Sequence, residues 1–217
     1  YPAGRYYFFL SENLFEREVG IDEDGDAWLM TLNYLHADGT NPDLTVYSDR
    51  LPLLSAAPLG SDEAATPFWG HVSNVLFSDL GADELRFFAR TSFHDRVMHF
   101  RSSHANTLAY FASGKGSALG LGDDFTAYSD HTSELPANQN NGFSNQGNAA
   151  QTNFPFYKVG DNHWGIRGRN FRWEADDFSS REQPSTEHRS WVRSRAICGD
   201  GIREGQEACG CCVKEGL

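Results

Sequence analysis

Apolar and aromatic residues form short runs along the chain, and turn-forming residues separate them. The first run is residues 6–10 (YYFFL), and the second is residues 27–35 (AWLMTLNYL), which follows an acidic turn at 22–26. Aromatic and branched residues between turn signals are typical of strands. We therefore predict a hairpin that carries the acidic turn at its tip. The polar segment 11–20 is predicted to be a turn or a single helical turn.

The middle of the chain predicts one helix and a pair of strands. Residues 69–80 carry apolar side chains at close to helical spacing, which favours a short helix. Residues 85–91 and 95–101 alternate between apolar and polar side chains, so we expect two paired strands. Residues 189–193 are expected to form a closing strand. Residues 107–112 fit a helical turn or a strand equally well.

In three segments the apolar residues follow neither helical spacing nor strand alternation. Residues 37–67 are rich in proline, and we expect loops there, with a short strand or turn near 44–47. Residues 114–122 contain four glycines and a lysine but lack the Walker spacing, which favours a turn over a phosphate loop. Residues 125–173 are rich in Asn, Gln, Gly and Ser and contain many aromatics, which predicts an ordered, loop-built binding surface. The whole pattern predicts an α+β fold with short antiparallel strands, one or two small helices and a large C-terminal loop region.

Composition narrows the classes of partner. The chain has 217 residues, of which 39% are hydrophobic, enough for one domain and an appendage. Its net charge of −12 argues against nucleic acid and anionic membrane surfaces, because phosphate binding needs clustered Lys and Arg. No apolar run reaches the length of a membrane-spanning helix, so we expect no membrane insertion. Cations and neutral ligands such as sugars suit the chain better.

All of the cysteines lie near the end of the sequence, at Cys198, Cys209, Cys211 and Cys212. The surrounding segment is too short and polar to fold without cross-links. We therefore expect a recognition domain at 1–195 and a disulfide-stapled tail at 196–217, in an oxidising, extracellular compartment. A zinc site is the alternative, although no histidine lies nearby and the spacing is not a paired C-x-x-C. Because the chain starts with Tyr1 rather than Met, we expect that a targeting segment has been removed.

The acidic turn is one candidate cation site. Asp22, Asp24 and Asp26 alternate along a turn that contains Gly25. Calcium takes six to eight oxygen ligands, and alternating carboxylates on a tight turn can supply several of them. The twelve-residue EF-hand pattern is incomplete, because Asn33 stands where the closing Glu would be. The alternative is a solvated hairpin tip.

Four segments resemble, in order, segments of fibrinogen C-terminal-like domains. GDAWLMTLNYLH at 25–36 is similar to their GGGWTL-type strand, and FTAYSDH at 125–131 to the F-S-T-x-D-x-D opening of their calcium loop. NHWGI at 162–166 resembles their N-G-I-H-W turn, and WVR at 191–193 their last strand. The resemblance covers about residues 6–193. It implies a secreted, fibrinogen-like globule related to ficolins and intelectins, which bind acetylated or exocyclic-diol sugars, often with calcium.

The resemblance also implies a calcium loop. Its metal candidates here are Asp123, Asp124, Ser129, Asp130 and Glu134. The two Asp positions of the family motif fall at Ser129 and His131, and the family's disulfides are missing from the main domain. The segment at 138–147 also replaces the aromatic-Cys-His segment of the ficolin acetyl pocket. The alternative is a polar loop capped by its own side chains.

Sugar-binding candidates follow within the same region. Side-chain amides donate to and accept from hydroxyl groups, and an aromatic ring can stack on a pyranose. We therefore select a set of amide, hydroxyl and ring side chains, namely Asn141, Phe143, Ser144, Asn145, Tyr157, His163 and Trp164. The alternative is that the amides only satisfy the backbone of the loop.

The resulting hypothesis is a secreted carbohydrate-binding or adhesion domain, a calcium-assisted lectin whose partners are glycans. A structural subunit of an extracellular filament, matrix or surface layer is the alternative, in which the cysteines link copies into a homo-oligomer. The tail at 198–209 (CGDGIREGQEAC) resembles small C-G-D-G modules of large secreted bacterial and protist proteins. A hydrolase is the third hypothesis. No G-x-S-x-G or His-Glu-x-x-His motif occurs, so we expect no catalytic residues.

Overall fold

The computed structural model describes residues 3–10, 13–36, 70–91, 95–134, 136, 144–152, 156–158, 162–164, 186–194 and 212–214. Within these residues, a nine-stranded sheet dominates the molecule. Eight of its strands run in the order β11-β1-β2-β3-β10-β5-β6-β7, and β4 pairs with β3. Every pairing in this sheet is antiparallel.

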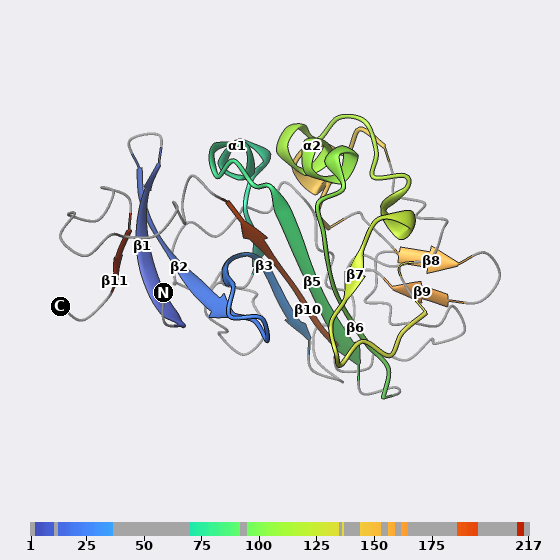
Figure 1. Ribbon diagram of the computed structural model, residues 1–217. Coiled ribbons are helices and arrows are strands. Elements are labelled where there is room, and N and C mark those ends of the chain that lie inside the picture. Colours follow the sequence, from blue (N-terminus) through green and yellow to red (C-terminus); the bar gives the residue numbers. More distant parts are fainter. Residues whose placement is uncertain are drawn as a thin grey trace.

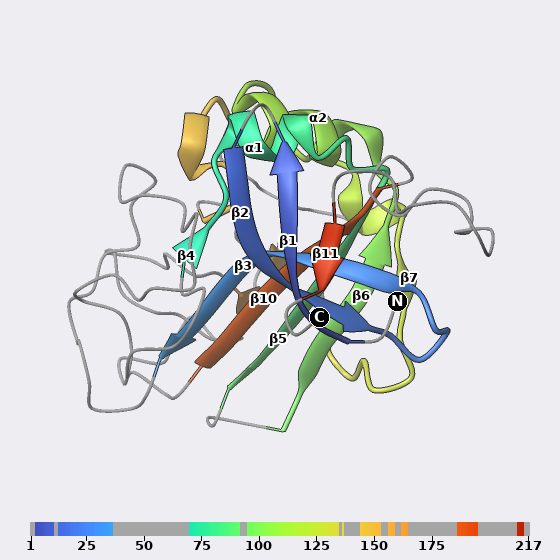
Figure 2. The ribbon, with the colours of Figure 1, turned by 90° about the vertical axis from the view of Figure 1, so that its left-hand side faces the viewer.

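The strands of the large sheet are β1 (Gly4–Leu10), β2 (Asn13–Ile21), β3 (Ala27–His36), β4 (Gly70–His71), β5 (Glu84–Thr91), β6 (Val97–Ser102), β7 (Thr126–Ala127), β10 (Thr186–Arg193) and β11 (Cys212–Lys214). A second, two-stranded sheet consists of β8 (Phe156–Lys158) and β9 (Asn162–Trp164). The helices are α1 (Asn74–Asp79) and α2 (Ala105–Ser113), with short 3-10 turns η2 (Leu121–Asp123) and η3 (Gly147–Ala149). Figure 1 shows both helices on one side of the large sheet, with β1, β2 and β11 at one end of the molecule and β8 and β9 at the other. Figure 2 shows the helices above the crossing strands from the end at which β1 and β11 lie.

The core lies between the sheet and the helices, and alternation along the strands produces it. On β5, Leu85, Phe87 and Ala89 face this core, and the intervening residues face the opposite side of the sheet. The Phe87 and Phe100 rings stack with centroids 5.0 Å apart. Phe111 of α2 meets Phe87 edge to face, which fixes the helix on the sheet.

The opposite face of the sheet carries a smaller apolar cluster beside polar residues. Trp28, Met30 and Trp191 are buried there, and Phe88 packs against them. In the register of β5 and β6, Phe88 lies opposite His99. This second face therefore combines aromatic rings with titratable side chains, and it holds the polar contacts around the acidic turn.

The predicted acidic hairpin tip is present, but a different strand leads into it. The acidic turn joins β2 to β3, and the prediction of a turn or helical turn at 11–20 is wrong. Strand β2 pairs along its length with β1, where Arg5 lies opposite Glu18, and Val19 of β2 is buried in the core. A cross-strand pair of opposite charge and a buried apolar side chain stabilise a strand whose own composition does not favour one.

The other elements largely follow the sequence pattern. The strand pair β5 and β6 and the closing strand β10 are confirmed. The helix predicted at 69–80 is shorter, because Ser73 caps its start by accepting a hydrogen bond from the Leu76 N–H at 3.1 Å and Gly70–His71 forms β4. Residues 107–112 belong to α2, which Gly114 ends in the left-handed conformation. The coarse α+β class is therefore confirmed, and the segment at 44–47 lies outside the described residues.

The predicted tail is described only at β11. This strand extends the large sheet by pairing with β1, and Cys212 lies opposite Phe8. Cys198, Cys209 and Cys211 lie outside the described residues. The division into a domain and a separate tail stays a prediction.

The position of Phe100 in the core leads to a stability prediction. Phe100 is fully buried, whereas Val75 on α1 is 70% exposed. Phe100→Ala leaves a cavity and is expected to lower the free energy of unfolding by about 3–5 kcal/mol. Val75→Ala is the control, with an expected change below about 0.5 kcal/mol. Urea denaturation followed by tryptophan fluorescence measures both, and equal effects would contradict this placement of the core.

Candidate functional site

Asp22 joins the acidic turn to a loop that lies far from it in the sequence. Its Oδ1 accepts from the backbone N–H groups of Asp24 at 3.1 Å and Asp26 at 2.8 Å. Its Oδ2 accepts from the Trp28 indole N–H at 2.8 Å and from the Tyr128 hydroxyl at 2.6 Å. Partial burial acts to raise the pKa of Asp22, but the bonds from Tyr128 and Trp28 outweigh it and keep the pKa below its ordinary value.

Glu23 makes a second connection beside the first. Its Oε1 accepts from the backbone N–H of Ser129 at 3.1 Å, and its Oε2 accepts from the Ser129 hydroxyl. A carboxylate that takes two donors from one residue fixes that residue in position and orientation. Two consecutive residues of the acidic turn therefore hold two consecutive residues of the loop.

His99 and Asp130 form a pair at the next position along the loop. The Nδ1 of His99 lies 2.6 Å from Oδ1 of Asp130, and its Nε2 accepts from the Arg86 Nε–H at 2.9 Å. Because an arginine can only donate, the proton of the neutral imidazole is on Nδ1 and points at Asp130. Burial lowers the pKa of His99, although Asp130 partly offsets that effect. With both ring nitrogens occupied, the His99 imidazole offers no free lone pair to a substrate.

Aromatic rings hold the guanidinium of Arg86 in this cluster. Its central carbon lies 4.6 Å from the centre of the Trp191 ring and 5.2 Å from that of Tyr128. The His99 ring stacks on Tyr128 with centroids 4.2 Å apart. Cation–π contacts of this kind stabilise a partly buried arginine. Tyr128 is thus in contact with a carboxylate, an imidazole and a guanidinium.

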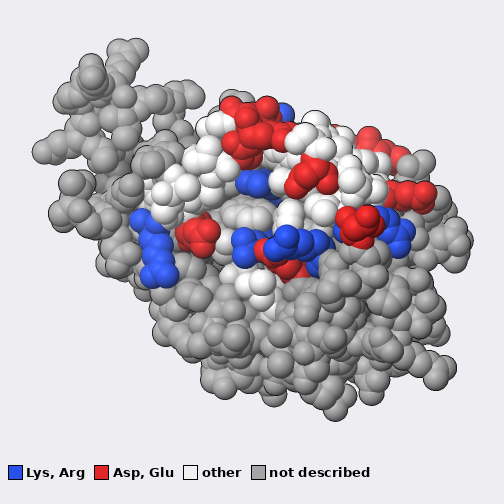
Figure 3. Space-filling view, turned by 90° about the horizontal axis from the view of Figure 1, so that it is seen from below, with Lys and Arg blue, Asp and Glu red and all other residues white. Residues whose placement is uncertain are grey.

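Arginines also neutralise the remaining carboxylates of the acidic turn. Nη1 of Arg193 lies 2.7 Å from Oδ2 of Asp26, and Nη2 of Arg101 lies 3.2 Å from Oδ2 of Asp24. Both arginines also pair with Glu84. Figure 3 shows the consequence on this face, where acidic and basic groups are interspersed instead of gathering by sign. Protein donors therefore contact each of the three aspartates of the acidic turn, and calcium at this turn stays a prediction.

The loop at 144–152, which we call the amide loop, is attached to the sheet and to α1. His71 is buried, and its Nε2 donates to the backbone oxygen of Asn148 at 2.9 Å, so its Nδ1 accepts from the Tyr34 hydroxyl at 2.7 Å. The side-chain oxygen of Asn148 accepts from the Asn74 N–H at 2.9 Å, where α1 begins. The side chain of Gln151 donates to the backbone oxygen of Val72 at 2.8 Å.

The amide loop also packs on the glycine-rich segment that follows α2. Asn145 takes a positive φ of 55°, and its side-chain oxygen accepts from the Gly116 N–H at 3.0 Å. The Asn145 N–H donates to the Gly116 oxygen and the Gly147 N–H to the Gly114 oxygen, each at 3.0 Å. The glycine-rich segment and the amide loop, which lie apart in the sequence, therefore form one ordered surface.

The structure places the predicted sugar-binding residues in three groups. Ser144 and Asn145 are exposed on the amide loop. The side-chain oxygen of Asn145 accepts from a backbone N–H group, which is the alternative to sugar binding that the sequence left open. The register of β8 and β9 places Tyr157 opposite His163 and Trp164 opposite Phe156. The other two candidates, Asn141 and Phe143, lie outside the described residues.

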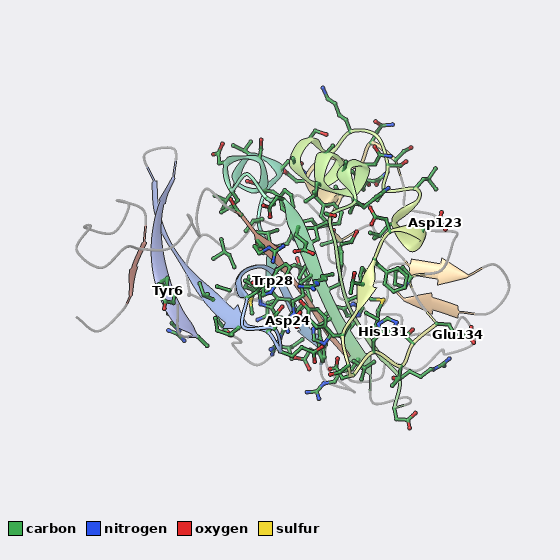
Figure 4. The ribbon with its side chains drawn as sticks, in the orientation of Figure 1. Tyr6, Asp24, Trp28, Asp123, His131 and Glu134 are labelled. Carbon is green, nitrogen blue, oxygen red and sulfur yellow. The ribbon has the colours of Figure 1, made fainter. Side chains whose placement is uncertain are left out.

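The predicted calcium ligands at 123–134 are spread out. Asp123, Asp124 and Glu134 are exposed, and Figure 4 shows Asp123 and Glu134 apart from each other. Ser129 bonds Glu23, and Asp130 pairs with His99. Across the described part of the chain, no group of three or more His, Cys, Asp or Glu side chains is arranged to hold a metal ion. Calcium at this loop stays a prediction.

Arg86, His99 and Tyr128 were not predicted from the sequence to be members of one cluster. Alternation on the paired strands would place Arg86 and His99 on the same face of the sheet, so the sequence could have predicted that these two residues lie near each other. The contact of Tyr128 with Asp22 had none, because it joins residues 106 positions apart.

A scan against models of protein families finds no match for this chain, and a search of curated proteins finds no relative. Among the described helices, none has the length and apolar character needed to cross a membrane.

The contact between the glycine-rich segment and the amide loop can be tested at Gly114. A Cβ at this position would lie 2.3 Å from the Gly147 Cα, whereas a Cβ at Gly116 would meet no atom within 4 Å. Both glycines have positive φ, which costs a non-glycine residue about 1–2 kcal/mol. Chemical denaturation should show that Gly114→Ala destabilises the protein by at least about 2 kcal/mol more than Gly116→Ala. Equal losses would show that the segments do not touch.

Buried His71 leads to a pH prediction. Burial lowers its pKa to about 4, from an ordinary value of 6.5. The unfolded chain takes up this proton at a higher pH than the folded chain does. The stability contributed by neutral His71 is therefore complete above pH 6.5 and declines as the pH falls from 6.5 toward 4, by about 3 kcal/mol in total.

The control for this pH dependence is His71→Gln, which removes the titrating ring. Unfolding free energies at a series of pH values should fall less steeply for the variant than for the wild type between pH 6.5 and 4. Burial lowers the pKa of His188 to about 3, but His188 titrates in both proteins, so its contribution cancels. Identical slopes would mean that His71 is not buried as the structure places it.

Proposed function

We propose that this chain is a secreted carbohydrate-recognition domain that binds a neutral sugar at the amide loop and the hairpin β8–β9. The observation that carries the proposal is that the amide loop is anchored along its length, although its only regular structure is the short 3-10 turn η3. His71, Asn148 and Gln151 connect it to the sheet and α1, and Asn145 connects it to the glycine-rich segment. A loop held in this way loses little conformational entropy when it binds a ligand.

The chemistry of the exposed positions supports a neutral, hydroxyl-rich ligand. Ser144, Asn145 and Asn148 are exposed, and they carry hydroxyl and amide groups without net charge. Hydroxyl and amide groups both donate and accept, as the hydroxyls of a sugar also do. Aromatic side chains of the β8–β9 hairpin would supply the stacking surface, and the sequence selects Tyr157 and Trp164 for this role.

Other parts of the proposal come from the sequence resemblance. These are the fibrinogen-like fold and the secretion of the chain. The calcium that the resemblance also implies is tested by the comparison of calcium and chelator below. The four cysteines near the end of the chain are in keeping with an oxidising compartment.

A second candidate function is a subunit of an extracellular assembly. The observation in its favour is that β11, which contains Cys212, adds to the large sheet at the edge of β1. A strand near the end of a chain that completes a sheet edge can also be donated to a neighbouring copy. Covalent multimers that disappear on reduction would favour this function over sugar binding.

The experiment for the leading proposal is a glycan array probed with the purified chain, in calcium and again in a chelator. We expect binding to one class of neutral glycans, and we expect Trp164→Ala to weaken it at least about tenfold, equivalent to about 1.4 kcal/mol. Val75→Ala, an exposed apolar residue of α1, is the matched control and should bind like the wild type. The absence of binding in both solutions would overturn the proposal.

A further inference from the structure

The two segments that the sequence predicts as separate cation sites are in contact with each other. Residues 22 and 23 of the acidic turn accept hydrogen bonds from Tyr128 and Ser129 of the second segment. In a calcium loop, the carboxylates and hydroxyls of a segment instead converge on the ion. The observed arrangement therefore uses carboxylates of one candidate to bind donors of the other.

The Asp22 carboxylate has no acceptor capacity left for a cation. A carboxylate offers about four lone-pair sites. Two backbone N–H groups, one indole N–H and one phenol O–H donate to Asp22. Coordination of an ion would break at least one of these bonds. The indole donor, Trp28, is fully buried, so its N–H would lose its partner in a place that water does not easily reach.

Arg86 supplies the positive charge of this cluster from within the protein. Its guanidinium stacks over the Tyr128 ring and donates to His99, which in turn bonds Asp130. Burial lowers the pKa of Arg86, whereas Tyr128, Asp22, Asp130 and Glu23 raise it. The guanidinium offsets part of the negative charge of these three carboxylates and so reduces their attraction for a second cation.

We propose that the acidic turn and Arg86 take the place of a bound cation and hold residues 128–131 in position without calcium. We call this set of contacts the clasp; it joins Asp22, Glu23 and Arg86 to residues 128–131. Glu23 is its positioning residue, since it binds both the N–H and the hydroxyl of Ser129. The inference concerns what orders the loop, so it does not depend on whether the chain binds a sugar. A calcium ion in this loop predicts that chelation loosens the loop, whereas the proposed arrangement predicts that chelation has no effect.

The test is backbone amide hydrogen exchange of the full chain, resolved on peptides that cover 126–134, in calcium chloride and in a chelator. We expect the two solutions to give the same exchange within about twofold, because the protecting acceptors belong to the protein. Glu23→Ala should speed exchange of this segment at least about tenfold, which corresponds to about 1.4 kcal/mol of local opening. Glu23→Gln keeps one carbonyl acceptor for the Ser129 N–H and should give an intermediate rate.

Two further variants test the clasp at positions other than Glu23. Asp123→Asn changes an exposed carboxylate of the expected calcium set and should leave exchange unchanged. Ser129→Ala removes the hydroxyl contact without touching the acidic turn, so it tests the clasp if Glu23→Ala impairs folding. Faster exchange in the chelator than in calcium would overturn the inference. Wild-type exchange in both Glu23→Ala and Ser129→Ala would overturn it as well.

Discussion

The hydrogen bond between Tyr128 and Asp22 is the contact on which the second face of the sheet depends. It joins the tip of the β2–β3 hairpin to the loop that follows β7, across 106 positions of sequence. The same carboxylate orients the indole of Trp28, and the Tyr128 ring supports both His99 and Arg86. Loss of this one hydrogen bond would therefore disturb a turn, a strand and a loop together. The apolar cluster of Trp28, Met30 and Trp191 lies beside this contact.

The opposite face of the sheet is held together by different chemistry. There the core is formed by aromatic and aliphatic side chains between sheet and helices, and polar contacts lie at its margin. His71 and Tyr34 are polar residues within that buried layer, and each satisfies the other while His71 reaches the amide loop. Buried polar groups that are fully paired specify one arrangement of the chain around them. The amide loop takes its conformation from this pair and from the glycine-rich segment, and contributes no regular structure of its own beyond η3.

The sequence allows the elements of this fold to be predicted better than their contacts. Alternation identifies β5 and β6 because one face of each strand is apolar and the other polar. It does not identify β2, because the charged residues Glu16, Arg17 and Glu18 interrupt the apolar pattern. Pairing with β1 stabilises this strand instead. Glu23 and Ser129 were each visible as polar loop residues, but nothing local shows that they meet. A carboxylate cluster also looks the same in sequence whether arginines or a metal ion neutralise it, and here Arg101 and Arg193 are 75 and 167 positions from Asp26.

The place of β10 in the sheet has a consequence for how the chain is made. This strand is among the last along the sequence, yet it lies between β3 and β5 and pairs with both. Until residues 186–193 leave the ribosome, β3 and β5 have no common neighbour, and two incomplete sheets expose their unpaired edges. Completion of this sheet therefore requires residues 186–193, and its folding is expected to be slow because it depends on contacts of long sequence range. A chain that lacks residues 186–193 exposes the strand edges that β10 later covers, and such edges favour aggregation or binding by a chaperone.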